Sequence, residues 1–159
     1  MTEMEKELVR QGWELFTRIF MKYDILEKSP IDLGTGDKLN AAQIHMIEAI
    51  GKGYGETVTT LSDHFMITKG AVSQIVTKLH SLRYITKTKR SGNDKEIILK
   101  LTDKGQLAFD LHEKYNRSTL NNVTQLMEKY SQEDVQAFLK ILKDIDLMLT
   151  GFIEEEKKK

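Results

Sequence analysis

The sequence predicts a mainly α-helical protein with a single β-hairpin near its middle. Apolar residues recur at helical spacing over about the first 26 residues and again over residues 102–152. Between these ends the helical patterns are short, and the apolar period changes to two only over residues 84–101. The 159 residues hold one proline and no cysteine, so we expect one domain without disulfides or thiol chemistry.

A long amphipathic helix is expected at the N-terminal end. Its apolar stripe runs from Leu8 to Tyr23 and includes Trp13. Residues 27–38 interrupt this pattern, because they hold the only proline and two close glycines. The next helical pattern therefore belongs to a separate element.

Three shorter helices follow the interruption. Asn40, Thr59 and Thr68 are their expected N-caps, in that order. The third of these helices, in TKGAVSQIVTKL, has one apolar face and one small, donor-rich, basic face. The polar face consists of Lys69, Ser73, Gln74, Thr77 and Lys78.

Two strands joined by a turn are expected next. YITKTKR and KEIILKL have strand length and β-branched residues, and SGND between them has turn chemistry. We expect Ile97, Leu99 and Leu101 to share the inward strand face. The polar and basic positions of this hairpin are Lys87, Lys89, Arg90, Asn93 and Lys95.

Two long helices complete the prediction. Thr102 opens the first, and SQED at residues 131–134 resembles a capping box that opens the second. Apolar residues of the last helix are spaced by three and four, as in helices that pair. A core helix within one chain is the alternative, but both terminal helices are too apolar for a small domain to cover, which favours dimerisation. The paired positions are Val135, Phe138, Leu142, Ile145, Leu149 and Phe152.

Charge is unevenly distributed along the chain. Residues 67–104 hold nine Lys or Arg and three Asp or Glu, a net +6 within a chain of formal net charge zero. A basic segment between acidic ends indicates an anionic partner, although a solvated basic face is the simpler alternative. The chain has no apolar run of about 18 residues and starts without a signal-peptide pattern, so we expect a cytoplasmic protein and no membrane partner.

Two short helices joined by a tight turn and followed by a basic hairpin form a winged helix-turn-helix. Its second helix has the size to enter a DNA major groove, where Gln74 could pair with adenine. Thr68 and the helix N-terminus could receive a phosphate, and Gly70 leaves room for close approach of the backbone. The hairpin tip is of the kind that enters a minor groove. Exposed polar residues without a DNA role are the alternative.

The chain resembles the MarR family (multiple antibiotic resistance regulator) of transcription factors over residues 38–116. The matching stretches are LNAAQIHMIEAI, TTLSDHFMITKGAVSQIVTKLHSLRYI and SGNDKEIILKLTDKG. Members of this family often carry Asp-x-Arg in the wing, where this chain has Asn93-Asp94-Lys95, so the Asp–Arg pairing that steadies the wing is not retained.

The resemblance implies a homodimeric repressor on palindromic double-stranded DNA, released by a small molecule or a metal. It implies one domain over residues 1–159, with the winged helix-turn-helix at 38–102 and dimerisation helices at 1–37 and 103–159. Some zinc-sensing relatives use a His on the second helix and His-x-x-x-His on the fifth. Asn116 takes the last of those positions here and is a poor zinc ligand, so we expect no metal and no cofactor.

The resemblance also places an effector pocket beside the second and fifth helices. Half-buried histidines that form structural hydrogen bonds, a metal site and an organic-anion contact are the three interpretations of His45 and His112. The aromatic residues of the first helix are equally consistent with a core. The candidate effector contacts are Trp13, Tyr23, His45, His112 and Tyr115.

Two other function classes remain to be distinguished. A winged-helix module that binds protein instead of DNA would show weak, salt-insensitive DNA binding. An enzyme acting through His45 or His112 would need a nucleophile or metal partner, and the sequence offers neither at a suitable spacing. We therefore expect a regulator and no enzyme.

Overall fold

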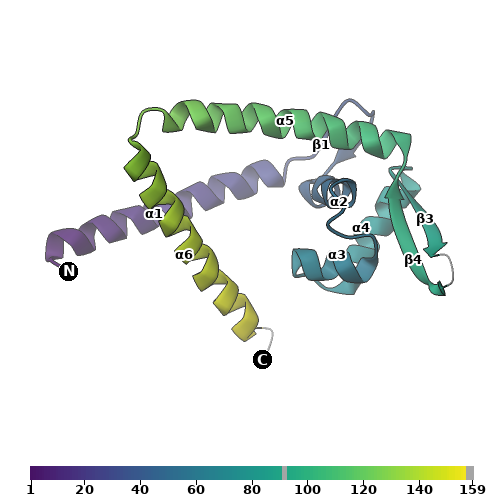
Figure 1. Cartoon of the computed structure of the whole chain (residues 1–159), viewed down its shortest axis with the longest axis horizontal. Coiled ribbons are helices and arrows are strands. Elements are labelled where there is room, and N and C mark those ends of the chain that lie inside the picture. Colours follow the sequence, from purple (N-terminus) through teal and green to yellow (C-terminus); the bar gives the residue numbers. More distant parts are fainter. Residues whose placement is uncertain (91–92, 157–159) are drawn as a thin grey trace. The chain divides into compact units, whose positions relative to one another are not determined.

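The computed structural model describes residues 1–90 and 93–156, with the backbone but not the side chains described at residue 90 and residues 93–95. The chain divides into two compact units, Met1–Lys114 and Tyr115–Lys159. The mainly helical fold with one longer hairpin is confirmed (Figure 1). Ser91 and Gly92, expected at the hairpin tip, lie outside the described residues.

The elements follow the expected order, with one short hairpin added after the first helix. In the first unit lie α1 (Glu3–Glu27), β1 (Ile31–Asp32), β2 (Lys38–Leu39), α2 (Ala41–Gly51), α3 (Val58–Phe65), α4 (Lys69–Ser81), β3 (Ile85–Arg90), β4 (Asn93–Leu101) and the first part of α5 (Asp103–Met127). The second unit holds the rest of α5 and α6 (Gln132–Glu156).

The observed N-caps of α2, α3 and α4 agree with two of the three caps predicted from the sequence. Asn40 and Thr68 cap α2 and α4 as expected, each side chain accepting a backbone N–H three residues on. Thr59 is wrong as the cap of α3, because Thr57 takes this place. Thr57 and Thr60 exchange two hydrogen bonds of 3.0 and 3.1 Å, so the reciprocal box selects the earlier threonine.

The β1–β2 hairpin was not predicted from the sequence. Its strands are two residues long and pair Ile31 with Leu39. Asp32 organises the turn between them by accepting the N–H groups of Gly34 at 2.8 Å and Gly36 at 3.3 Å. Both glycines have φ near +85°, a region that other residues rarely adopt, so the two close glycines that suggested an interruption build a turn.

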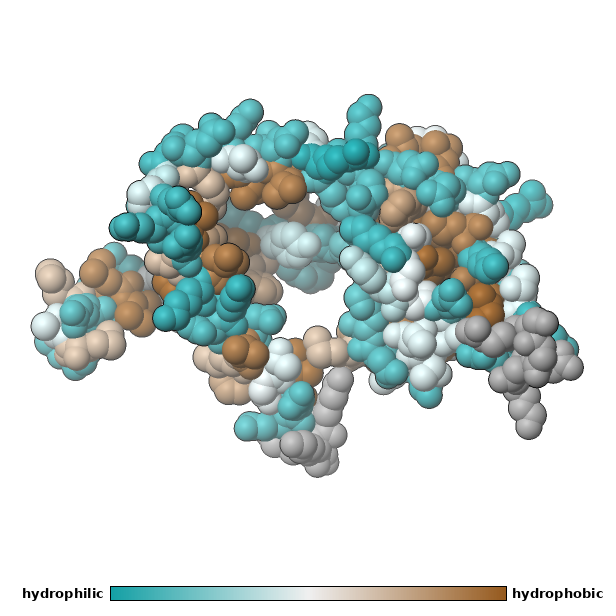
Figure 2. Space-filling view, viewed as in Figure 1, coloured by the Kyte–Doolittle hydropathy of each residue, from teal (hydrophilic) through white to brown (hydrophobic). Residues whose placement is uncertain are grey.

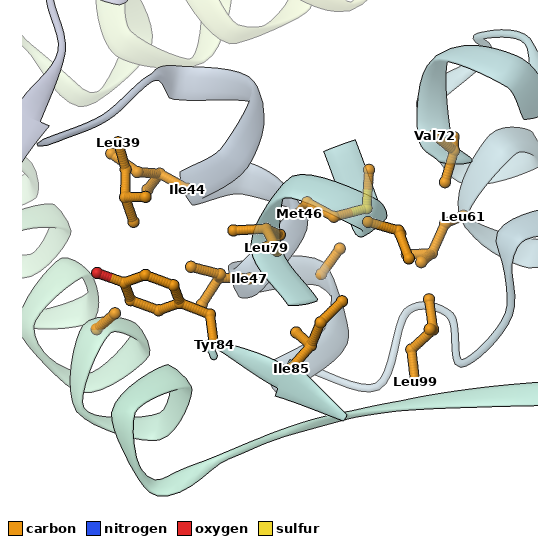
Figure 3. Close-up of a cluster of buried hydrophobic side chains, with 13 residues drawn as sticks. Leu39, Ile44, Met46, Ile47, Leu61, Val72, Leu79, Tyr84, Ile85 and Leu99 are labelled. Carbon is orange, nitrogen blue, oxygen red and sulfur yellow. The ribbon is translucent and has the colours of Figure 1, made fainter. Parts of the chain in front are cut away.

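One apolar cluster forms the core of the first unit. Figure 3 shows side chains from separate helices and strands meeting in it. Full burial of each Leu or Ile contributes roughly 1.5–3 kcal/mol, so this cluster fixes α4 firmly by one face. The buried members are Leu39, Ile44, Met46, Ile47, Ala49, Leu61, Val72, Val76, Leu79, Tyr84, Ile85, Leu99 and Ala108.

The junction between the hairpin and α5 is closely packed. Thr102 donates through its hydroxyl to the carbonyl of Arg83 at 2.6 Å and accepts the N–H of Gly105 at 3.1 Å. A Cβ on Gly105 would lie 2.0 Å from the carbonyl oxygen of Tyr84. Gly105 in the first helical turn is therefore required by the close approach of the backbone that begins β3.

The strands of the β3–β4 hairpin pair antiparallel from Ile85↔Leu101 to Lys89↔Ile97, with an irregularity before Arg90. Leu99 packs in the core as expected, and its N–H also donates to the carbonyl of Glu56 at 2.7 Å. The expectation for Ile97 is wrong, because its side chain is 40% exposed while Ile98 is buried. The strand leaves the core toward its tip, so burial near the tip no longer follows the alternation.

The second unit is a helical hairpin. Ser131 and Asp134 form the expected capping box at the start of α6, with the two N–H contacts at 3.1 Å. Leu126, Met127, Tyr130, Val135 and Phe138 line an apolar cleft beside this turn, together with Asp134.

Neither α1 nor α6 buries a single residue within the chain. Figure 2 shows apolar side chains at the surface of both helices. Phe20 on α1 and Phe138 on α6 are 54% and 47% exposed. No helix in the described part of the chain has an apolar stretch that could cross a membrane.

Candidate nucleic-acid interface

The polar face of α4 lies at the surface of the first unit. Val72, Val76 and Leu79 are buried on the opposite side of the helix. Because the apolar residues recur every three or four positions, the residues between them point outward. Figure 1 shows α4 beside α3 and the base of the β3–β4 hairpin. The exposed residues of this face are Lys69, Gly70, Ser73, Gln74, Thr77 and Lys78.

Ser81 extends this surface beyond the residues predicted from the sequence. It lines an open depression together with Ser73, Gln74, Thr77 and Lys78. Its hydroxyl donates to the carbonyl of Lys78 at 2.7 Å. The i+4 spacing from Thr77 to Ser81 was the available signal, since it continues the polar stripe by one helical turn.

The N-terminus of α4 is also exposed. Met66 ends α3 in the left-handed region at φ 55°, which turns the chain sharply toward α4. Thr68 caps α4 by accepting the N–H of Ala71 at 3.2 Å. The N–H groups of Lys69 and Gly70 precede the first intrahelical bonds, so they point away from the helix as potential phosphate donors.

The β3–β4 hairpin brings further basic residues to the same unit. Lys87 and Lys89 are exposed on β3. Arg90, Asn93 and Lys95 belong to the paired strands by their backbone, and their side chains lie outside the described residues. The structure thus combines a polar helix face and a basic hairpin, as the sequence predicted for a winged helix-turn-helix.

His45 and His112 meet in a cluster of charged residues between α1, α2 and α5. Their ring centroids lie 6.0 Å apart. Glu48 contacts both histidines through one carboxylate oxygen, each at 3.5 Å. His45 also contacts Glu27 at the end of α1, with its Nε2 3.1 Å from the carboxylate. Lys52 then joins Glu48 at 2.6 Å to Glu113 at 3.0 Å.

We call these six residues the His–Glu cluster. Of these six residues, the sequence predicted only the two histidines as site residues. Glu48 at i+3 from His45 and Lys52 at i+4 from Glu48 were detectable signals, because such positions are neighbours on a helix. Glu113 directly follows His112 in the sequence, whereas Glu27 comes from α1 and no local spacing indicates it.

The cluster shifts the ionisation of its members. Burial opposes the charge on Glu48, but Lys52 and the two histidines outweigh burial and hold its pKa below the usual value. Glu48 and Glu113 raise the pKa of Lys52. Burial lowers the pKa of His112, and the nearby carboxylates only partly oppose this effect. His112 is therefore neutral over a wider pH range in the folded protein than in the unfolded chain.

Folding stability should depend on the protonation of His112. Because its pKa is lower in the folded state, the unfolded chain takes up a proton first as the pH falls below the unperturbed value near 6.5. The contribution of the neutral side chain is complete above that pH and is lost progressively below it. We expect the free energy of unfolding, measured in urea, to fall less for His112→Gln than for the wild type between about pH 7 and pH 5.

The matched control is His80→Gln, which replaces an exposed histidine of α4. This variant controls for the loss of an imidazole at an exposed position. Equal slopes for the wild type and His112→Gln would contradict the assigned role of burial.

The other effector candidates divide between the units. Tyr23 lies one helical turn from Glu27, and burial together with Glu27 raises its pKa. Trp13 stacks on Phe16 of the same helix, with centroids 5.6 Å apart. Tyr115 belongs to the second unit and is exposed within it. Among the described residues, no group of three or more His, Cys, Asp or Glu is arranged to hold a metal ion.

Comparison with known proteins identifies the family. No protein-family model matches the chain. The chain is 33% identical to the HTH-type transcriptional regulator PchR of Bacillus subtilis (strain 168) over 118 residues, or 74% of this chain and 68% of PchR. Its fold is similar to that of Streptococcus pneumoniae FabT, solved in complex with DNA, with a TM-score of 0.74, 24% identity and coverage of 91% of this chain and 99% of that chain. It is also similar to Lactococcus lactis ZitR, a zinc-responsive MarR family member, with a TM-score of 0.72, 17% identity and coverage of 89% and 99%. The chain belongs to the MarR family of HTH-type transcriptional regulators.

Proposed function

We propose that this regulator binds double-stranded DNA sequence-specifically and represses transcription by occupying a promoter. The exposed polar face of α4 carries the proposal. Amide, hydroxyl and ammonium groups on one helix face are the groups that read base edges in a major groove. A net +6 over residues 67–104 would hold the same surface against phosphates. The DNA complex of the similar FabT supports this use of the fold.

Within this proposal the residues have separate roles. Ser73, Gln74 and Thr77 read bases, whereas Thr68, Lys69, Gly70 and Lys78 position α4 on the backbone. The hairpin contacts the backbone and the adjacent minor groove through Lys87, Lys89, Arg90, Asn93 and Lys95. A winged-helix module that binds a protein partner would not need separate sets of base-reading and phosphate-contacting side chains.

The protein acts as a homodimer in this proposal. Two helices of 25 residues each bury no side chain within one chain, although both carry apolar stripes. Apolar surface of this extent is rare on soluble monomers and typical of subunit interfaces. Residues 1–37 and 103–159 then supply the dimer, and residues 38–102 the DNA-binding part of a single domain.

A small molecule or a metal would release the repressor by binding near the His–Glu cluster. The cluster joins the end of α1 to α2 through the Glu27–His45 hydrogen bond, and α2 to α5 through the Lys52–Glu113 ion pair. A ligand there would contact both the helices proposed for dimerisation and the part proposed to bind DNA. Release requires only that the ligand prefer the conformation with weaker DNA affinity, a preference worth typically 1–3 kcal/mol.

Replacing Gln74 with alanine should separate base reading from backbone binding. We expect Gln74→Ala to lose about 1–3 kcal/mol of affinity for the specific duplex and almost none for scrambled DNA. Its side chain is exposed, so stability should not change. Fluorescence anisotropy on both duplexes gives the two affinities.

Lys87→Ala is the matched comparison, because it removes an exposed cation of the hairpin. It should weaken both duplexes alike and reduce the salt slope by about one. If Gln74→Ala also weakens both duplexes equally, Gln74 does not read bases.

A further inference from the structure

The end of α4 is tied to the β1–β2 hairpin by one carboxylate. Asp37 accepts a hydrogen bond from the hydroxyl of Tyr84 at 3.1 Å and contacts the ammonium of Lys104 at 2.5 Å. Thr35 is hydrogen-bonded to the same tyrosine hydroxyl at 2.5 Å. Asp37 is therefore contacted by two residues that are distant in the sequence, Tyr84 at 47 positions and Lys104 at 67 positions along the chain.

Tyr84 lies between the end of α4 and the start of the β3–β4 hairpin, which is the wing of the winged helix-turn-helix. The chain reverses at Arg83, which has φ 64°, and β3 begins at Ile85. The Tyr84 ring is fully buried in the core, and Figure 3 shows its hydroxyl at the edge of the apolar cluster. The hydroxyl is thus held in a fixed position between α4, the helix proposed to recognise DNA and here called the recognition helix, and the β3–β4 hairpin.

Lys104 makes the same connection from the other end of the wing. It follows β4 in the first turn of α5, and its ammonium lies 4.6 Å from the centre of the Tyr84 ring. It also contacts the carbonyl of Leu82, the C-cap of α4, at 3.4 Å. Tyr84 and Lys104, which flank the β3–β4 hairpin, therefore both contact Asp37, and Lys104 adds the contact to the C-cap of α4.

Charge supports this geometry. Lys104 holds the pKa of Asp37 below its usual value, and the Tyr84 hydroxyl and the charge of Lys78 act in the same direction. Lys78 lies on the polar face of α4. The Asp37 and Lys104 side chains are 27% and 36% exposed, and ion pairs this accessible contribute little to stability.

We propose that Asp37 is a positioning residue for DNA recognition, which holds the end of α4 and the base of the wing against the β1–β2 hairpin. The β1–β2 hairpin directly follows α1 along the chain, so this contact lies between α1 and α4 in the connectivity of the fold. This inference rests on the proposed DNA-binding function. It adds a connection between the helix proposed for dimerisation and the helix proposed to read bases.

The test uses the full chain and a duplex that the wild type selects from a random-sequence pool. We expect Asp37→Asn and Tyr84→Phe each to weaken binding to this duplex about tenfold and binding to a scrambled duplex less than twofold. The double variant should lose less affinity than the two single losses combined, because both substitutions weaken the shared Asp37–Tyr84 contact. Each variant should also discriminate less against a duplex with one base pair inserted between the half-sites.

The matched control is Asp63→Asn, which removes the same charge at an exposed position of α3. It should leave the preference for the selected duplex over the scrambled duplex unchanged, and melting curves of every variant monitor folding. Higher affinity of Asp37→Asn for both duplexes with a steeper salt slope would show that Asp37 only repels DNA, and would overturn the inference. Unchanged discrimination would also overturn it, as would equal losses on both duplexes. A wild type that selects no sequence refutes the proposed function itself.

Discussion

Gly105→Ala should destabilise the protein more than alanine at any other glycine in the described structure. The added Cβ would lie 2.0 Å from the carbonyl oxygen of Tyr84 and 3.3 Å from the Cβ of Leu101. Both neighbours lie at the base of the β3–β4 hairpin, which cannot move away from Gly105 without disturbing the core. We expect a loss of about 3 kcal/mol or more in the free energy of unfolding, measured by urea denaturation.

Gly70→Ala is the control for this experiment. Gly70 is also helical, and the nearest atom to its added Cβ is 3.8 Å away. Alanine costs less conformational entropy than glycine in a helix, so this variant should be neutral or more stable by up to about 1 kcal/mol. Equal stability of Gly105→Ala and the wild type would show that the hairpin base is not packed as described.

Phe138→Glu should convert the proposed dimer to monomers. Phe138 is 47% exposed within one chain and lies on the apolar stripe of α6. In a symmetric dimer each copy of the substitution would place a carboxylate against apolar surface. We expect a cost of about 3 kcal/mol, which weakens the dimer roughly a hundredfold, as measured by sedimentation equilibrium.

Gln136→Glu adds the same charge two residues away, at an exposed polar position of α6. It should leave the mass of the dimer unchanged. A Phe138→Glu protein that sediments as a dimer of wild-type affinity would place the subunit interface elsewhere.

Periodicity and capping chemistry predicted the order of the helices and the β3–β4 hairpin. They are local signals, and the structure satisfies them at Asn40, Thr68 and Ser131. The cap of α3 was misplaced because three threonines stand at or near the start of that helix, at positions 57, 59 and 60, and only the Thr57–Thr60 pairing distinguishes them. The prediction that Ile97 packs inward was wrong, because alternation identifies the face of a strand but not the point along the strand at which that face is no longer covered by the core.

Contacts between distant residues were beyond prediction from one sequence. Gly105 was an unfavourable residue in a helical pattern until the carbonyl of Tyr84 was located beside it. Likewise, the spacing of Glu27 and His45 does not indicate that they meet, because the intervening hairpin sets their distance. The polar face of α4 was predictable in full apart from Ser81, since helical spacing alone defines it.

Reading of DNA sequence by the exposed face of α4 can be tested by fluorescence anisotropy of the wild type on DNA from upstream of its own gene and on scrambled DNA, across a salt series. We expect tight binding to the native fragment, a steep salt slope and a clear loss of affinity on scrambling. Weak binding to both fragments that does not respond to salt would contradict it and would favour a protein partner.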